Sequence, residues 1–188
     1  GASNLRYCDE IERVNLMGTP SGDGVLESLQ GKASLREIEV GRCVTDAGIR
    51  FLHQIPQFKA LHGDGAHLML DGPFTNQGVA RLAGLEGVAH LDLFWHVTGI
   101  TCDAFAALKD LPNLQSLGAD GHLSTDLALR HMAAIPSLRN LRAQEAVATE
   151  DGFVALSRSE TLEGFWGREC PNFGRRAFLC SAPGSPAT

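Results

Sequence analysis

The sequence lacks a long apolar run, an excess of basic residues and a paired-cysteine motif, and each absence excludes a class of protein. No apolar run approaches the roughly 18 residues that a membrane span needs, so we expect no membrane partner. The formal net charge is −6, and nucleic-acid binding requires a basic patch, so we expect no nucleic-acid partner. The five cysteines are odd in number and show no CxxC spacing, which argues against a disulfide framework or a zinc site. We therefore expect a cytoplasmic protein.

The motifs of the common catalytic sites are also missing. The sequence contains no HExxH, no nucleophile elbow and no phosphate-binding loop. The tripeptide GDG occurs at residues 22–24 and 63–65, where glycine is typical of a turn between elements. We expect no cofactor and favour a protein without catalytic activity, although these absences alone leave the question of an enzyme open.

What the sequence does contain is an internal repeat. Similar units begin at six positions separated by 23, 30, 26, 24 and 24 residues, namely Gly22, Thr45, Thr75, Thr101, Thr125 and Thr149. Within each unit an apolar residue recurs at three fixed positions, and the last of these is occupied by Ile38, Leu61, Leu91, Leu117, Leu141 and Phe165. A fixed period of this length indicates stacked units rather than a conventional globular core.

Each unit combines a predicted helix with a predicted strand. The starting Thr is a typical N-cap, and apolar residues follow at helical spacing, as at Ile49, Leu52 and Ile55. Short alternating stretches follow, such as LREIEV at 35–40 and VAHLDL at 88–93, and alternation predicts a strand. One helix and one strand cannot bury their own apolar faces, so the units are expected to stack into a solenoid.

This pattern resembles the leucine-rich repeat family. The segments LREIEVGRC (Leu35–Cys43) and VAHLDLFWH (Val88–His96) are similar to the core L-x-x-L-x-L-x-x-N/C. The TDAG that begins at Thr45 resembles the ribonuclease-inhibitor-like class and the bacterial T-D-x-G-L repeats. The resemblance, over residues 5–178, implies an α/β horseshoe of about 6–7 repeats of roughly 24 residues, with parallel strands on the concave face and helices on the convex face.

The expected domain organisation follows from the repeat. A single domain over residues 1–180 is predicted, with an irregular insertion at about 66–74 and a disordered tail at 181–188. Neither end shows a clear polar cap, and uncapped solenoid ends associate with one another. A homodimer formed through such ends, by a fragment of a longer protein, is therefore one alternative that the sequence leaves open.

The family resemblance places function on the concave face, where we expect a protein partner to bind. Aligning the units predicts which strand residues point to this face, because alternate side chains of a strand point to opposite sides. The centre of the predicted face is acidic and would steer a basic partner, and aromatic residues and Arg are favoured in binding hot spots. The predicted binding residues are Glu39, His62, Asp64, Asp92, Phe94, Asp120, Arg142, Trp166 and Arg168.

A second alternative is a metal-binding or hydrolase-like protein. The same alignment places His62, His90 and Asp92 close together. Imidazole and carboxylate groups are common zinc ligands, and an imidazole beside carboxylates is a candidate general base. An open, wet face is a poor environment for catalysis, so this hypothesis ranks below protein binding, and no metal site is assigned.

Overall fold

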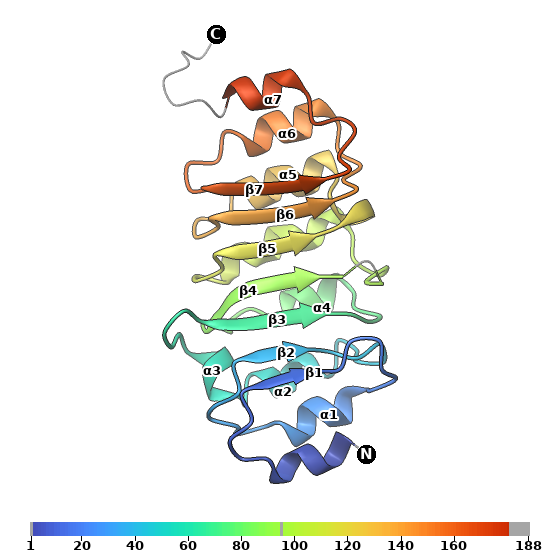
Figure 1. Ribbon diagram of the computed structural model, residues 1–188, viewed down its shortest axis with the longest axis vertical. Helices are drawn as coiled ribbons and strands as arrows, with labels where there is room; N and C mark the ends of the chain where they lie inside the picture. The colour runs from blue at the N-terminus through green and yellow to red at the C-terminus, as the bar shows by residue number, and fades with distance from the viewer. Residues whose placement is uncertain (1, 95, 181–188) are drawn as a thin grey trace.

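The chain forms an α/β structure with a single open sheet of seven parallel strands. The computed structural model describes residues 2–94 and 96–180; the tail at 181–188, expected to be disordered, lies outside the described residues. The strands lie side by side in chain order (Figure 1). They are β1 (Arg13–Asn15), β2 (Glu37–Glu39), β3 (Ala66–Leu70), β4 (Val88–Leu93), β5 (Ser116–Ala119), β6 (Asn140–Gln144) and β7 (Gly164–Arg168).

Helices connect the strands and cover one face of the sheet (Figure 1). They are η1 (Ala2–Tyr7), α1 (Asp23–Ser28), α2 (Ile49–Leu52), α3 (Pro56–Lys59), α4 (Asn76–Ala80), η2 (Cys102–Asp110), η3 (Gly121–Leu123), α5 (Asp126–Ala133), α6 (Glu150–Leu156) and α7 (Arg175–Cys180). A single covered face and a sequential strand order are compatible with a solenoid-like stack, in which each unit packs on its neighbours. None of these helices has the length and apolar character to cross a membrane, over the residues that the structure describes.

The core is a layer between the sheet and its helices. One residue from the middle of each strand points into this layer, and these residues pair with one another in register across the whole sheet: Val14, Ile38, Leu68, Leu91, Leu117, Leu141 and Phe165. All except Phe165 are buried, and full burial of a side chain of this kind contributes about 1.5–3 kcal/mol. The helices add Leu26, Ile49, Phe58, Phe105, Met132 and Phe153 from the other side.

The third strand corrects two predictions from the sequence. Residues 66–70, expected within an insertion, form β3, and Leu68 pairs with both Ile38 and Leu91. Leu61, expected in the core column, is 43% exposed. The additional residues of this unit lie before the strand instead, in α3 and in the turn that contains Gly63 and Gly65. Alternating burial along β3 explains its position, because Leu68 and Leu70 point into the core while His67 and Met69 do not.

A polar ladder joins the starts of consecutive helices and explains the T-D-x-G pattern. Asp23 accepts hydrogen bonds from the backbone amide (2.7 Å) and the hydroxyl (2.8 Å) of Thr45. Asp46 holds Thr75 with the same pair of bonds, at 2.9 and 2.5 Å. The ladder continues from Asn76 to Thr101 and from Asp126 to Thr149. Each link satisfies the backbone amide of a Thr, which is the N-cap residue at Thr75, Thr101 and Thr149 and lies four residues before α2 at Thr45.

The glycine of the pattern provides space for the carboxylate of the preceding unit. A Cβ added to Gly48 would overlap Asp23, and one added to Gly78 would overlap Asp46. The unit that begins at Thr125 has alanine, Ala128, at this position, and it follows Cys102, which carries no carboxylate. Glycine is therefore present beside the carboxylates of Asp23, Asp46 and Asp126, whereas the unit that follows Asn76 has alanine, Ala104, at this position.

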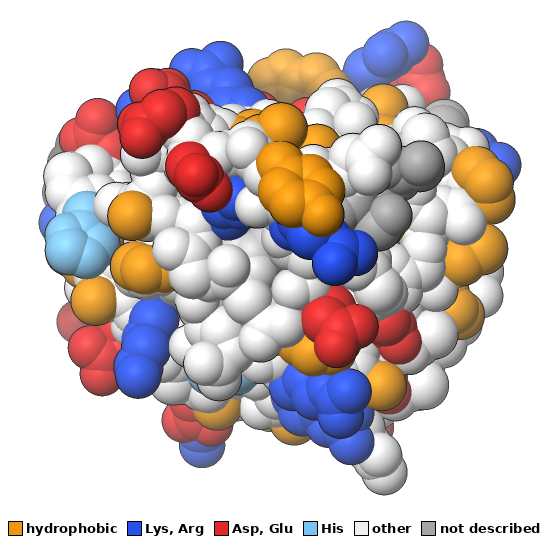
Figure 2. All heavy atoms as spheres, turned by 90° about the horizontal axis from the view of Figure 1, so that it is seen from below, with side chains coloured by type: hydrophobic (Ala, Val, Ile, Leu, Met, Phe, Trp, Pro, Cys, Tyr) orange, Lys and Arg blue, Asp and Glu red, His pale blue; other side chains and the backbone are white. Residues whose placement is uncertain are grey.

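The N-terminal end of the stack is covered by η1, which lies against α1. Lys32 is buried there, and its Nζ donates to the Arg6 carbonyl at 2.7 Å and to Asp9 at 3.0 Å. Figure 2, seen from this end, shows acidic, basic and hydrophobic side chains interspersed across the surface. Self-association through the ends stays a prediction.

Candidate binding face on the open side of the sheet

The side of the sheet away from the helices presents two rows of side chains, which together we call the open face. Strand register places them opposite one another on neighbouring strands, roughly 4.8 Å apart. The first row is Arg13, Glu37, His67, His90, Ser116, Asn140 and Gly164, and the second is Asn15, Glu39, Met69, Asp92, Gly118, Arg142 and Trp166. Apart from Gly118, these residues are half-buried or exposed.

The structure corrects the predicted positions of His62 and Asp64. Both lie in the exposed loop before β3, outside the strand pairing. His67 lies in the first row instead, and Met69 lies in the second row, where His62 was expected. The physical reason is the shift of the third strand described above. The signal that would have located His67 is the alternating pattern AHLML at 66–70.

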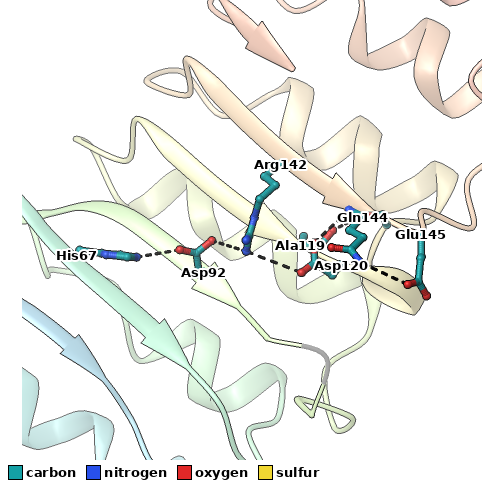
Figure 3. A network of polar contacts seen from close by, with 8 residues as sticks. His67, Asp92, Ala119, Asp120, Arg142, Gln144 and Glu145 are labelled. Atoms are coloured by element: carbon teal, nitrogen blue, oxygen red, sulfur yellow. Dashed lines mark hydrogen bonds and ion pairs between the residues drawn. The ribbon is translucent and has the colours of Figure 1, made fainter. Parts of the chain in front are cut away.

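A network of polar contacts crosses the open face from β3 to β6 (Figure 3). His67 Nε2 lies 2.8 Å from Asp92 Oδ2. Arg142 Nη2 donates to Asp92 Oδ1 at 2.9 Å and lies 3.7 Å from Asp120 Oδ2. The Gln144 backbone amide donates to Asp120 Oδ1 at 3.0 Å. Asp92 is thus held between the His67 imidazole on β3 and the Arg142 guanidinium on β6.

Gly118 makes the central contact of this network possible. It lies on β5, between Asp92 on β4 and Arg142 on β6. A Cβ at Gly118 would overlap both Asp92 Oδ1 and Arg142 Nη2. The absence of a side chain therefore lets the carboxylate and the guanidinium meet across an intervening strand.

Several of the other predicted binding residues are less exposed than expected or already paired with a neighbouring side chain. Asp120 is buried rather than presented to solvent, and Arg142 is shared between Asp92 and Asp120 rather than free. Phe94 is half-buried, with its ring centroid 5.3 Å from that of His96. Arg168 is exposed and lies 3.4 Å from Glu169.

Two hollows lie on the open face and share Ser116. The larger, of about 320 Å³, is lined by His67, His90, Asp92 and Ser116. The smaller, of about 220 Å³, is lined by Ser116, Asn140, Leu141, Arg142, Gly164, Phe165 and Trp166. Small side chains on β5 keep the centre of the face low, while the Trp166 side chain, 50% exposed, stands at one side. The open face is therefore a shallow depression lined mainly by polar residues, with the Trp166 ring at one side.

The network shifts the proton affinity of its members. The hydrogen bond to Asp92 raises the pKa of His67; burial acts against this, and the charges of Asp92, Glu37 and Glu39 reinforce it. Burial of the Asp92 carboxylate acts to raise its pKa, but the hydrogen bond with His67 and the charges of Arg142, His67 and His90 outweigh burial and leave the pKa lowered. A raised pKa of His67 and a lowered pKa of Asp92 both favour the charged forms of these two side chains, and therefore an ion pair between them.

The geometry assembles neither a metal site nor a catalytic triad at the predicted centre. His62 lies in the loop before β3, outside the strand pairing that positions His90 and Asp92. No group of three potential metal ligands occurs among residues 2–94 and 96–180. His67, Asp92 and Ser116 line one hollow, but within the described part of the chain no side-chain hydrogen bond joins Ser116 to an imidazole. A serine nucleophile needs a base within hydrogen-bond reach.

Sequence reasoning also missed a second histidine–carboxylate pair. Asp71 directly follows β3 and is fully buried, and His96 Nδ1 lies 2.8 Å from its Oδ1. Its other oxygen, Oδ2, has no hydrogen-bond partner among residues 2–94 and 96–180 and lies 3.9 Å from Arg42 Nε. Because Asp71 was assigned to an insertion, nothing in the sequence pattern indicated that it would be buried.

Comparison with models of known protein families finds no match to this chain, and comparison with curated proteins finds no similar sequence.

Proposed function

We propose that the chain is a leucine-rich-repeat-type module without catalytic activity, which binds a protein partner through the open face. The horseshoe curvature and the assignment of one repeat to each helix–strand unit belong to this proposal. The observation that carries it is the seven-stranded parallel sheet, covered by helices on one side and uncovered on the other. An uncovered sheet face of ordered polar side chains with one exposed Trp has the composition of a binding surface.

The polar network supports binding because it fixes charged groups before a partner arrives. Asp92 and Arg142 hold one another across Gly118, so little side-chain freedom remains to be lost on binding, and ordering each flexible side chain costs about 0.5–1.5 kcal/mol. The residues that we assign to the interface are Glu39, His67, Met69, Asp92, Arg142 and Trp166. His67 and Met69 replace His62 and Asp64 of the sequence-based set, and Phe94, Asp120 and Arg168 are no longer included because they lie outside the two rows of the open face.

Changing Trp166 to alanine should remove the largest apolar anchor of the face. Truncation of an aromatic hot spot weakens binding by about 2 kcal/mol or more, which is roughly thirtyfold in affinity. The matched control is Leu127→Ala on α5, because Leu127 is similarly exposed, at 41% against 50% for Trp166, but lies on a helix. The measurement compares the proteins that each immobilised variant retains from an extract of cells that make this protein.

We expect the Leu127→Ala bait to retain the same specific protein as the unmodified bait and the Trp166→Ala bait to lose it. Both variants should melt within about 2 °C of the unmodified chain, because surface changes alter stability by about 0.5 kcal/mol at most. Equal retention by both variants would contradict the assignment of the open face.

A further inference from the structure

Glu39 stands out on the open face because its carboxylate is unpaired among the residues that the structure describes. Its neighbour Glu37 lies 3.4 Å from Arg13, whereas no side-chain hydrogen bond or ion pair of Glu39 occurs among the described residues. Burial, followed by the negative charges of Glu37 and Asp92, raises the pKa of Glu39, with His67 acting in the opposite direction. A carboxyl group whose folded pKa is raised destabilises the fold once it ionises. Among the described residues, the charge of His67 is the one influence that offsets this unfavourable ionisation of Glu39.

We propose that the open face accepts an extended segment of the partner bearing lysine or arginine, with one cationic side chain between Glu39 and Asp92, and that protonation of His67 weakens this contact. The inference rests on the proposed function and adds the chemistry of the partner and its regulation. A cationic segment is favoured over other occupants by charge complementarity with Glu37, Glu39 and Asp92.

The register gives this cation a defined place. Glu39 on β2, Met69 on β3 and Asp92 on β4 pair in sequence across the face. The two carboxylates therefore belong to strands about 10 Å apart, separated by two strand spacings, and a cationic head between them lies within reach of both. The half-buried Met69 provides an apolar surface on which the methylene stem of lysine or arginine packs. The hollow of about 320 Å³ beside Asp92 leaves room for the rest of the side chain.

His67 already occupies one side of Asp92 and competes with an incoming cation. The groups that face it are Glu37 and Glu39 on β2 and His90 and Asp92 on β4, while Arg142 contacts Asp92 from the other side. Protonated His67 neutralises part of the negative charge that attracts the partner. Deprotonated His67 still lies beside Asp92 but contributes no positive charge. Because its pKa lies above the ordinary value of 6.5, binding should strengthen as the pH rises from about 6 to 8.

The test uses the peptide acetyl-(Lys-Gly)3-amide, whose alternate lysines point to one side when the peptide is extended. Binding is followed by amide chemical shifts at pH 6 and pH 8. We expect tighter binding at pH 8, by about fivefold, and shifts centred on Met69 and Asp92, since a single exposed charge pair changes affinity by up to about fivefold. The Glu39→Gln variant should bind about fivefold more weakly at pH 8. It should also unfold at a higher temperature, which shows that it folds.

Two controls separate a defined site from diffuse attraction. Glu27→Gln on α1 changes the net charge equally, and Glu27 is exposed there, so its affinity for the peptide should stay unchanged. His67→Gln keeps a donor towards Asp92 but cannot titrate near neutrality, so the pH dependence should largely disappear. Equal weakening by Glu39→Gln and Glu27→Gln, or an unaltered pH dependence in His67→Gln, would overturn the inference. If the peptide fails to bind while the Trp166-dependent protein is still retained, this inference fails and the proposed function stands.

Discussion

Replacing Gly78 with alanine should lower the free energy of unfolding by about 2–4 kcal/mol, although alanine is the better helix former by about 1 kcal/mol. Gly78 lies within α4, and its new Cβ would overlap Asp46 Oδ1. Asp46 would have to release Thr75, whose amide and hydroxyl both donate to it. Hydrogen bonds to charged groups contribute about 1.5–3 kcal/mol each. Denaturant unfolding measures the change directly.

A double-mutant cycle shows whether the loss arises at the ladder. In an Asp46→Ala background the obstructing carboxylate is gone, so Gly78→Ala should be neutral or stabilising, and the two changes should be strongly non-additive. Ala128 is the natural precedent, because it occupies the same place after Cys102. A Gly78→Ala variant as stable as the unmodified chain would show that the glycine of the T-D-x-G pattern serves another purpose.

Replacing Gly118 with alanine should dismantle the polar network while leaving the sheet in place. The new Cβ would occupy the space in which Asp92 meets Arg142. Asp92 would then move away from His67, and the pKa of the His67 imidazole should fall towards its ordinary value, because the hydrogen bond to Asp92 is the main cause of its rise. Partner affinity should fall about tenfold or more, since fixed charges are lost from the centre of the face. Titration of the His67 ring protons by NMR gives the pKa.

Gly164→Ala provides the matched control for this change. Gly164 also lies on the open face, but its Cβ would meet only the Asn140 side chain, which is exposed and free to move aside. We expect no change in the pKa of His67 in this variant. An unaltered His67 pKa in Gly118→Ala would mean that Asp92 does not depend on the gap that Gly118 leaves.

The sequence predicted the α/β character of the chain and most of the open face, because both follow from local periodicity. Alternation placed Glu39, Asp92, Arg142 and Trp166 on one face of the sheet, and strand register confirms that placement. N-caps at Thr75 and Thr125 are also confirmed, since their hydroxyls accept from backbone amides of the first turn.

The unit that begins at Thr45 could not be predicted in the same way because two apolar residues, Leu61 and Leu68, competed for one core position. Local spacing favoured Leu61, whereas the structure uses Leu68, since it pairs with Ile38 and Leu91 on the neighbouring strands. Pairing of this kind is a tertiary preference that overrides a one-dimensional alignment. Because Leu68 rather than Leu61 occupies the core position, His62 and Asp64 lie outside the open face, and His67 and Met69 lie on it.

The contacts within the face were also beyond the reach of a sequence pattern. Asp92 and Arg142 are separated by 50 positions, and their contact depends on the missing side chain of Gly118. The ladder was partly visible, because Thr followed by Asp indicated a helix start. That Asp46 holds the Thr of the next unit, rather than its own helix, emerged only once the units were stacked.

The central claim, that the open face carries the partner, is tested most directly by photo-crosslinking in cells that make this protein. One form carries p-benzoylphenylalanine at Asn140, which is exposed on β6, and the other carries it at Arg130, which is exposed on α5. Our account predicts a discrete crosslinked protein from position 140 that is absent from position 130. Crosslinking of the same protein from position 130 alone would contradict it, because the partner would then contact the helices rather than the sheet.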